Sequence, residues 1–100
     1  MYKIIKIEKS PRKGKRLRVF LDDGFHYDFG LETGSTYLDH HDIRKRENYI
    51  KRHYANAREK ELINNLIPSA SLFSMFLLWG PDVNLEKNIK YLNDLWADKK

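Results

Sequence analysis

The chain has 100 residues, of which 41% are hydrophobic and 13% aromatic, which suits one domain with a single core and excludes global disorder. Cysteine is absent, which excludes disulfides, thiolate zinc sites and cysteine nucleophiles. The net charge of +5 is unevenly placed: residues 1–18 hold eight Lys or Arg and one Glu, residues 19–41 hold five acids and no Lys or Arg, and residues 42–60 hold seven basic and three acidic residues.

The first thirty residues predict a three-stranded antiparallel meander. Residues 2–9, 16–22 and 25–29 alternate apolar with polar side chains, as strands with one buried face do. The dipeptide Asp23-Gly24 predicts a two-residue type I′ turn, in which both central residues have positive φ. The side chains expected on apolar strand faces are Ile5, Ile7, Leu17, Val19, Leu21, Phe25, Tyr27 and Phe29.

A basic helix is predicted after Asp39 or Asp42, either of which can cap its first free N–H groups. Its expected inward side chains are Ile43, Ile50 and Tyr54, with Tyr49 alongside, and its expected outward ones are Arg44, Lys45, Lys51 and Arg52. A second helix is predicted over residues 57–66, with Leu62, Ile63 and Leu66 inward, and Pro68 closes it.

An apolar helix over residues 69–79 is predicted to be the centre of the fold, because a helix without a polar face must be covered on all sides. Ser69 is its expected cap, and Gly80-Pro81 ends it. A last amphipathic helix, capped by Asn84, places Leu85, Ile89, Leu92 and Trp96 on one face. The predicted fold class is therefore α+β: a single domain over residues 1–100, with a three-stranded antiparallel meander in 1–30 packed on three to four helices in 37–97.

The helical half resembles a family of small, uncharacterised proteins of giant and other nucleocytoplasmic large DNA viruses. The resemblance covers roughly residues 37–96. Its spaced motifs are Tyr37, His40 or His41, Asp42, Arg46, Tyr49-Ile50, Arg52-His53, Ser69-Ala70, Ser74, Leu77-Leu78-Trp79 and Leu85 to Tyr91. Ser71 stands where the family pattern has glycine, and Met75 stands where it has a basic residue. The resemblance implies a viral, non-enzymatic accessory or virion protein, located in the host-cell cytoplasm or nucleus (the viral factory) or in the virion, and it supplies no catalytic residues.

Candidate catalytic and metal sites are weak in this sequence. Asp39-His40-His41-Asp42 holds ligand types that suit zinc or manganese, but adjacent residues rarely face one ion, and the cap-and-packing interpretation is preferred. The serines at 69, 71 and 74 lack the glycine frame of a nucleophile elbow. We therefore expect no enzyme activity, no metal and no cofactor. The longest apolar run, Met75–Trp79, is far shorter than the ~20 residues that span a bilayer, so no membrane partner is expected.

Arg52-His53, at the end of the basic helix, has two interpretations. The pair can simply suit the negative end of the helix dipole. Alternatively, it can pack on Tyr37, on Trp79 or on carboxylates of the meander as an internal polar clamp. Trp79 and Trp96 are interpreted as core or edge-of-core residues.

Two basic surfaces remain, and they carry the functional hypothesis. The first is the turn and strand over residues 9–18, and the second is the outer face of the basic helix over residues 44–52. We expect these surfaces to contact nucleic acid or another acidic partner. The predicted contact residues are Arg12, Lys13, Lys15, Arg16, Arg18, Arg44, Lys45, Lys51 and Arg52. The alternative hypothesis is a minor virion or capsid structural protein that acts through contacts with other virion proteins or with itself.

Overall fold

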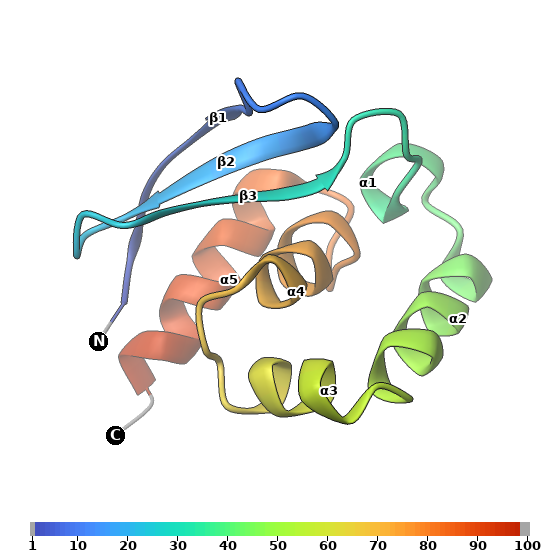
Figure 1. The fold of residues 1–100 in the computed structure, drawn as a ribbon. Coiled ribbons are helices and arrows are strands. Elements are labelled where there is room, and N and C mark those ends of the chain that lie inside the picture. The colour runs from blue at the N-terminus through green and yellow to red at the C-terminus, as the bar shows by residue number, and fades with distance from the viewer. Residues whose placement is uncertain (1, 99–100) are drawn as a thin grey trace.

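The computed structural model describes residues 2–98 and has the predicted α+β fold, with a three-stranded antiparallel sheet covered on one face by helices (Figure 1). The sheet consists of β1 (Ile4–Lys9), β2 (Lys15–Leu21) and β3 (His26–Leu31), which lie in the order β1-β2-β3. The helical part consists of α1 (Tyr37–His40), α2 (Ile43–Tyr54), α3 (Ala57–Asn64), α4 (Ala70–Phe73), the π-helical segment η1 (Ser74–Leu78) and α5 (Leu85–Asp98).

The inward face of β1 differs from the prediction because its pairing with β2 shifts between Ile4 and Lys6. A bulge of this kind changes which side chains face the core. Ile4 is therefore buried, whereas Ile5, which the alternation placed inward, is 62% exposed. Ile7 packs on the core as predicted. Phe25 is also exposed, since it lies in the turn before β3.

The turn between β2 and β3 is not the predicted type I′ turn. Gly24 has a φ of +90°, but the non-glycine residues with positive φ in the described chain are His41 and Leu66, so Asp23 does not share that conformation. The N–H of Gly24 donates to the carbonyl of Leu21 at 3.2 Å, and the N–H of Leu21 donates to the carbonyl of Phe25 at 3.0 Å. This pattern belongs to the three-residue hairpin loop that ends in a glycine bulge.

The continuous segment α4–η1 is the centre of the fold, as its apolar sequence predicted. The hydroxyl of Ser69 accepts a hydrogen bond from the N–H of Leu72 and caps the helix. At the other end, the N–H of Trp79 donates to the carbonyl of Ser74, five residues earlier, at 3.1 Å, which is π-helical bonding. The main core joins this segment to the sheet and to α5, and its buried members are Ile4, Val19, Leu21, Phe29, Leu72, Phe73, Leu77, Leu78, Leu92 and Trp96.

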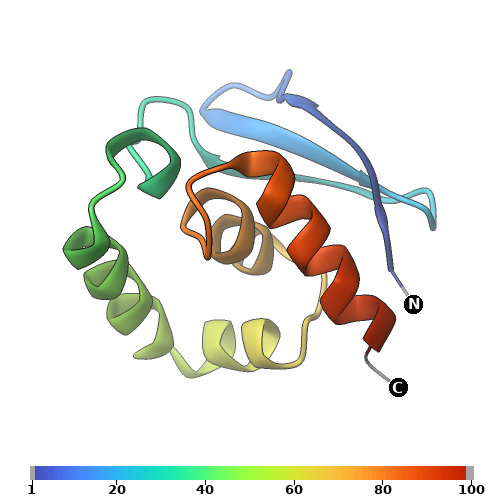
Figure 2. The same cartoon turned by 180° about the vertical axis from the view of Figure 1, so that it is seen from behind.

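Helices α2 and α3 form an arm that packs on α4–η1. All the helices lie on one side of the sheet, and its other face is uncovered (Figures 1 and 2). A second, smaller core of Tyr49, Ile63 and Met75 holds this arm. The predicted inward stripe of α2 is wrong at two positions, since Ile43 is 60% exposed and Tyr54 is 37% exposed.

The face of α2 that is turned inward is instead polar and aromatic. Arg46, Tyr49, Ile50 and His53 are buried or half-buried. Their spacing of i, i+3, i+4 and i+7 defines one side of a helix. The prediction failed at Ile43 and Tyr54 because it followed apolar residues alone, and Arg46 and His53, which take part in the inward face, are basic.

Helix α5 lies on the far side of α4–η1 in Figure 1 and in front of it in Figure 2, and its cap and inward face are as predicted. Asn84 accepts a hydrogen bond from the N–H of Lys87 at 3.0 Å. Farther along, the amide of Asn93 holds β1: its Oδ1 accepts from the N–H of Ile4 at 2.8 Å, and its Nδ2 donates to the carbonyl of Ile4 at 3.3 Å. The start of the sheet is therefore joined to the last helix.

None of the helices within residues 2–98 has the length and apolar character needed to cross a membrane.

Candidate functional site

A pocket of about 370 Å³ lies where the end of the sheet meets α2, α3 and α4–η1. Its walls come from β2, β3, the loop before α1, and the four helical segments around it. The lining residues are Lys15, Gly30, Leu31, Gly34, Ser35, Thr36, Tyr49, Arg52, His53, Glu59, Ala70, Ser71, Ser74, Leu78 and Trp79. The pocket thus combines titratable groups, hydroxyls and an aromatic wall.

Two of the sequence-predicted cations, Lys15 and Arg52, meet at this pocket although 37 positions separate them in the chain. Lys15 is the first residue of β2, and its N–H donates to the carbonyl of Arg12 at 3.1 Å, which tightens the hairpin tip. Arg52 lies in the last turn of α2, with its guanidinium carbon 5.8 Å from the centroid of the Tyr49 ring. The hairpin and the basic helix therefore each contribute one cation to the same pocket.

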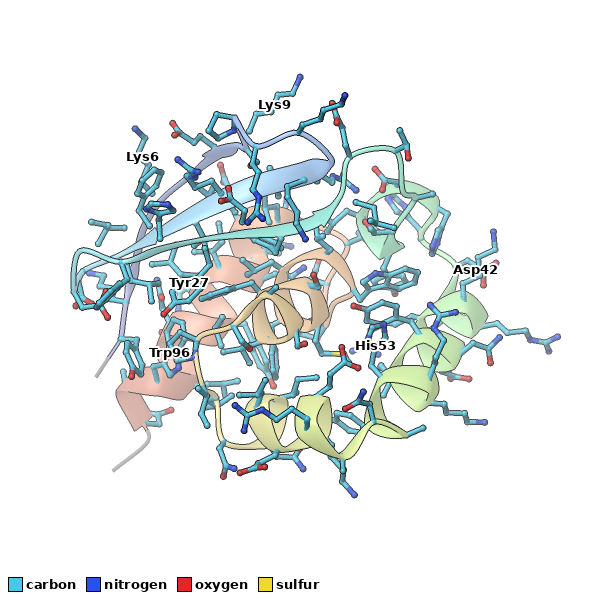
Figure 3. The ribbon with its side chains drawn as sticks, in the orientation of Figure 1. Lys6, Lys9, Tyr27, Asp42, His53 and Trp96 are labelled. Atoms are coloured by element: carbon cyan, nitrogen blue, oxygen red, sulfur yellow. The ribbon has the colours of Figure 1, made fainter. Side chains whose placement is uncertain are left out.

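A hydrogen-bonded chain of His53, Glu59 and Ser71 forms another part of the lining. His53 Nδ1 lies 3.1 Å from Glu59 Oε2, and the hydroxyl of Ser71 donates to Glu59 Oε1 at 3.2 Å. Both oxygens of Glu59 are thereby occupied. His53 lies on the inner side of α2, toward α4 (Figure 3). Within the described residues its other ring nitrogen, Nε2, has no hydrogen-bond partner.

The sharp corner between α2 and α3 brings Glu59 to His53. Asn56 caps α3, because its side-chain oxygen accepts hydrogen bonds from the N–H groups of Arg58 and Glu59. An acidic side chain in the first turn of a helix is also favoured by the helix dipole. Glu59 thus lies in the first turn of α3, where its carboxylate can reach His53 at the end of α2.

Stacked aromatic rings form the floor between α2 and η1. The rings of Tyr49 and Trp79 lie 4.2 Å apart and 7° from parallel, and the ring of His53 lies 4.1 Å from that of Tyr49 on its own helix. Burial raises the pKa of the Tyr49 phenol to about 12, with the charge of Glu59 acting in the same direction, while a hydrogen bond with Ser74 and the charge of Arg52 oppose the shift. The phenol is therefore neutral at physiological pH.

Arg46 holds the other side of these stacked aromatic rings. Its Nε donates to the carbonyl of Trp79 at 2.6 Å, and its guanidinium carbon lies 5.7 Å from the centroid of the Tyr37 ring. Gly80 has a φ of +132°, and a Cβ there would overlap the Arg46 guanidinium. The contacts with Tyr37 and Trp79 that one interpretation gave to Arg52-His53 as a polar clamp are thus made by Arg46, one to two turns earlier on the same helix.

Arg16 and Arg18, both predicted to contact nucleic acid, are engaged within the protein. Arg16 forms two hydrogen bonds to the carboxylate of Asp39, at 2.8 and 3.0 Å, and Arg18 does the same to Asp28, at 2.9 and 3.1 Å. The hydrogen bonds from Arg16 hold the pKa of Asp39 well below its usual range. Arg18, together with the hydroxyl of Ser10, lowers the pKa of Asp28 to about 2. Both arginines hold acidic side chains of the fold.

The remaining predicted cations take part in no ion pair within residues 2–98. They are Arg12, Lys13, Lys15, Arg44, Lys45, Lys51 and Arg52. All of them are exposed except Lys15, which is half-buried. Of the nine predicted contact residues, these seven therefore remain available to a partner.

Helical geometry divides the four cations of α2 into two pairs. Residues seven positions apart lie within roughly 20° of each other around a helix, so Lys45 shares an edge with Arg52, and Arg44 shares one with Lys51. The Lys45–Arg52 edge flanks Tyr49, and its Arg52 end lines the pocket. The Arg44–Lys51 pair is turned roughly 140–160° away from Tyr49, on the back of the helix. The two basic surfaces therefore meet along one edge of α2.

The His40-His41-Asp42 segment is used in local structure. The carboxylate of Asp42 accepts hydrogen bonds from the N–H groups of Arg44 and Lys45 and caps α2, which selects it over Asp39 as the cap. His40 Nδ1 accepts from the N–H of Asp42, and His41 Nε2 lies 3.1 Å from the carbonyl of Leu38. Asp39 belongs to the capping box of α1 with Thr36. No group of three or more His, Asp or Glu side chains suited to a metal ion occurs in the described part of the chain.

The polar part of the pocket was not predicted from the sequence. No pattern in the sequence singles out Glu59, and Ser71 and Ser74 are noted there only as lacking the glycine frame of a nucleophile elbow. His53 and Glu59 are six positions apart and lie on different helices, so no periodic pattern relates them. The only usable hint was that a serine-containing helix with no polar face must direct its hydroxyls at buried partners.

Residues 5–53 are similar to a protein family described as a family of unknown function (DUF5754). The matched range extends from β1 to the last turn of α2, so it includes Lys15, Arg52 and His53 and ends before Glu59. No curated protein and no solved structure matches the chain.

Proposed function

We propose that this protein is a non-enzymatic binding protein whose partner is a polyanion, with nucleic acid as the leading candidate. The observation that carries the proposal is the meeting of Lys15 and Arg52 at one pocket. Lys15 is continuous with the hairpin tip, where Arg12 and Lys13 are exposed, and Arg52 is continuous with Lys45 along the edge of α2. These five residues form one surface, the basic track.

The pattern of ion pairs supports the proposal. The acidic segment, residues 19–41, neutralises part of the hairpin, since Asp28 and Asp39 pair with Arg18 and Arg16, and Glu32 accepts a hydrogen bond from the N–H of Gly14. The cations of the basic track are left without carboxylate partners among residues 2–98. Unpaired, exposed Lys and Arg side chains contact phosphates and release counterions, which makes such binding dependent on salt and nearly independent of sequence.

A charge-matched pair of double variants tests the proposal. Lys45→Gln/Arg52→Gln removes two charges from the basic track, and Arg44→Gln/Lys51→Gln removes two from the back of the same helix. Affinity for an unrelated set of single- and double-stranded oligonucleotides is measured by fluorescence anisotropy over a range of salt concentrations. We expect the track variant to lower the salt slope by roughly one unit for each phosphate that it no longer binds, equally for all sequences, and the back variant to change it little.

The hairpin arm of the basic track is tested separately with Arg12→Gln/Lys13→Gln, for which the same uniform decrease is expected. If the track and back variants lowered the affinity equally, binding would depend on net charge alone, and the basic track would not be a specific binding surface. Absence of binding by the wild-type protein at low salt, where electrostatic attraction is strongest, would overturn the polyanion hypothesis.

The viral accessory role rests on the resemblance of the helical half to proteins of large DNA viruses, and it is part of this proposal. The second candidate, a minor virion or capsid structural protein, is favoured by large apolar side chains on the surface. Ile5, Phe25, Leu31 and Ile43 are each at least 60% exposed. Sedimentation velocity distinguishes the two roles, because self-association through apolar contacts persists at high salt, where phosphate binding is abolished.

A further inference from the structure

The shape of the pocket differs from that of the basic track outside it. A surface track accommodates a continuous strand, whereas this pocket is walled by two strands, a loop and the helical segments α2, α3 and α4–η1. Its volume of about 370 Å³ falls in the range of small-molecule sites. A nucleic-acid chain enters such a space with an end more readily than with an internal phosphate.

The charges that line the pocket favour an anion. Lys15 and Arg52 contribute two positive charges, and Glu59 contributes the single negative one. The carboxylate of Glu59 already has His53 on one oxygen and Ser71 on the other. It therefore acts as a fixed support for the imidazole.

The imidazole of His53 supplies a third group. With Nδ1 held by Glu59, the ring is fixed between that carboxylate and the Tyr49 ring, 4.1 Å away. Its Nε2 has no partner within the described residues. The imidazolium form of this ring donates Nδ1–H to Glu59 and presents Nε2–H to the pocket that Lys15 and Arg52 also line, where it can donate a hydrogen bond to an anionic oxygen.

We propose that this pocket binds a terminal phosphomonoester, with its oxygens between Lys15, Arg52 and His53. The identity of the phosphate as a nucleic-acid end rests on the function proposed above. A monoester carries about −1.5 to −2 charges near neutral pH, whereas each internal phosphodiester carries one. A pocket with two cations and a third donor therefore discriminates between the end of a chain and its interior.

Paired substitutions at His53 test the site. The amide of His53→Asn stands in for Nδ1, so it keeps a donor for Glu59 and removes the group at Nε2. The amide of His53→Gln stands in for Nε2, so it keeps a donor at that position and removes the group that binds Glu59. Affinities are measured for one oligonucleotide bearing a 5′-phosphate, a 3′-phosphate or hydroxyls at both ends.

For the wild-type protein we expect about tenfold tighter binding of one phosphorylated end than of the hydroxyl ends, the effect of one charge-assisted hydrogen bond. His53→Asn should reduce that preference to the part that Lys15 and Arg52 provide, and His53→Gln should retain more of it; an unchanged preference in both variants would remove His53 from the site. Neither variant should change the affinity for the hydroxyl-ended oligonucleotide, because the basic track extends outside the pocket. Circular dichroism and thermal melting establish that both variants are folded.

A second measurement separates this inference from the proposed function. Adenosine monophosphate is titrated into labelled wild-type protein while amide and side-chain NMR signals are followed, with adenosine as the control. Shifts at Lys15, Arg52 and His53, but not at Arg44 and Lys51, support the pocket even when no oligonucleotide binds, in which case only the proposed function falls. Oligonucleotide binding without preference for a phosphorylated end, and without these shifts, overturns the pocket site and leaves the function standing. Absence of both kinds of binding overturns both.

Discussion

At the scale of single residues, the basic side chains divide into those that hold the fold and those that remain for a partner. Arg16, Arg18 and Arg46 each bind an internal acceptor: the carboxylates of Asp39 and Asp28, and the carbonyl of Trp79. A bidentate pairing of guanidinium and carboxylate fixes geometry in a way that lysine does not. The arginines of β2 and of the inner face of α2 are therefore structural, whereas the neighbouring Lys15 and Lys45 form no ion pair within residues 2–98.

Asp28 gives a pH-dependent prediction. Its pKa is lowered to about 2 by Arg18 and Ser10, from an ordinary value of 3.8. Because the folded-state pKa is depressed, the stabilisation is fully present above about pH 4 and disappears as the pH falls from about 4 to about 2. Asp28→Asn should therefore lower the free energy of unfolding at neutral pH and flatten its decline over that acidic range.

The measurement is urea denaturation at a series of pH values. Asp94→Asn is the control, since Asp94 pairs with Lys90 on the surface at 2.7 Å and both side chains are largely exposed. Exposed pairs contribute little to stability. If the Asp28→Asn and wild-type curves ran parallel between pH 4 and 2, the Arg18–Asp28 pair would not be the source of acid sensitivity.

At the scale of elements, α4–η1 organises both cores and one wall of the pocket. Leu72, Phe73, Leu77 and Leu78 face the sheet and α5, Met75 faces the arm, and Ser71 and Ser74 face the pocket. The last turn of this helix is π-helical and so contains one residue more than an α-helical turn. Trp79 follows it and stacks on Tyr49. Because its sides pack on the sheet, on α5 and on the arm and line the pocket, this segment has no polar face turned to solvent.

Leu77→Ala tests the importance of this element. Leu77 is 0% exposed, and the substitution should cost about 2–5 kcal/mol of unfolding free energy, since a deleted core side chain leaves a cavity. Phe76→Ala should cost less, because Phe76 is only half-buried and packs at the surface against Tyr91. Chemical denaturation measures both. A smaller effect for Leu77→Ala than for Phe76→Ala would contradict a central position for Leu77.

At the scale of the entire chain, the two ends of the described residues are joined. Ile4 in β1 and Asn93 in α5 lie 89 positions apart and exchange two hydrogen bonds. The bulge between Ile4 and Lys6 bends the start of β1 at this point. An asparagine side chain can satisfy both backbone groups of one residue, because it carries a donor and an acceptor.

Asn93→Ala should destabilise the whole fold, by about 1–3 kcal/mol, because it leaves the backbone groups of Ile4 without partners. Asn93→Asp keeps the acceptor for the N–H of Ile4 and removes the donor, so its cost should be intermediate. Hydrogen exchange at the Ile4 amide, together with thermal melting, distinguishes these cases. An alanine variant as stable as the wild type would show that β1 is held by the sheet alone.

Much of the fold could be predicted because its signals are local. Alternation in residues 16–22, the caps at Asp42, Ser69 and Asn84, and the heptad-like spacing from Leu85 to Trp96 each depend on neighbouring residues. Apart from the type of the turn at Asp23-Gly24, the errors occurred where tertiary pairing or packing overrode the local pattern. The bulge moved Ile5 outward, and the packing of Arg46 and His53 on η1 and α3 rotated Ile43 and Tyr54 toward solvent.

Composition and periodicity were sufficient for the α+β class, the order of the elements, the apolar centre and the position of the excess positive charge, since these signals act over a few residues. Which cations are free, and where they meet, depends instead on tertiary contacts. Arg16 and Arg18 are neutralised by acids 23 and ten positions away, and Lys15 and Arg52 are brought to one pocket that Glu59 and Ser71 complete. Side chains from β2, α2, α3 and α4 line that pocket because the burial of the two cores brings those elements together. The pattern within any one of these elements does not predict that arrangement.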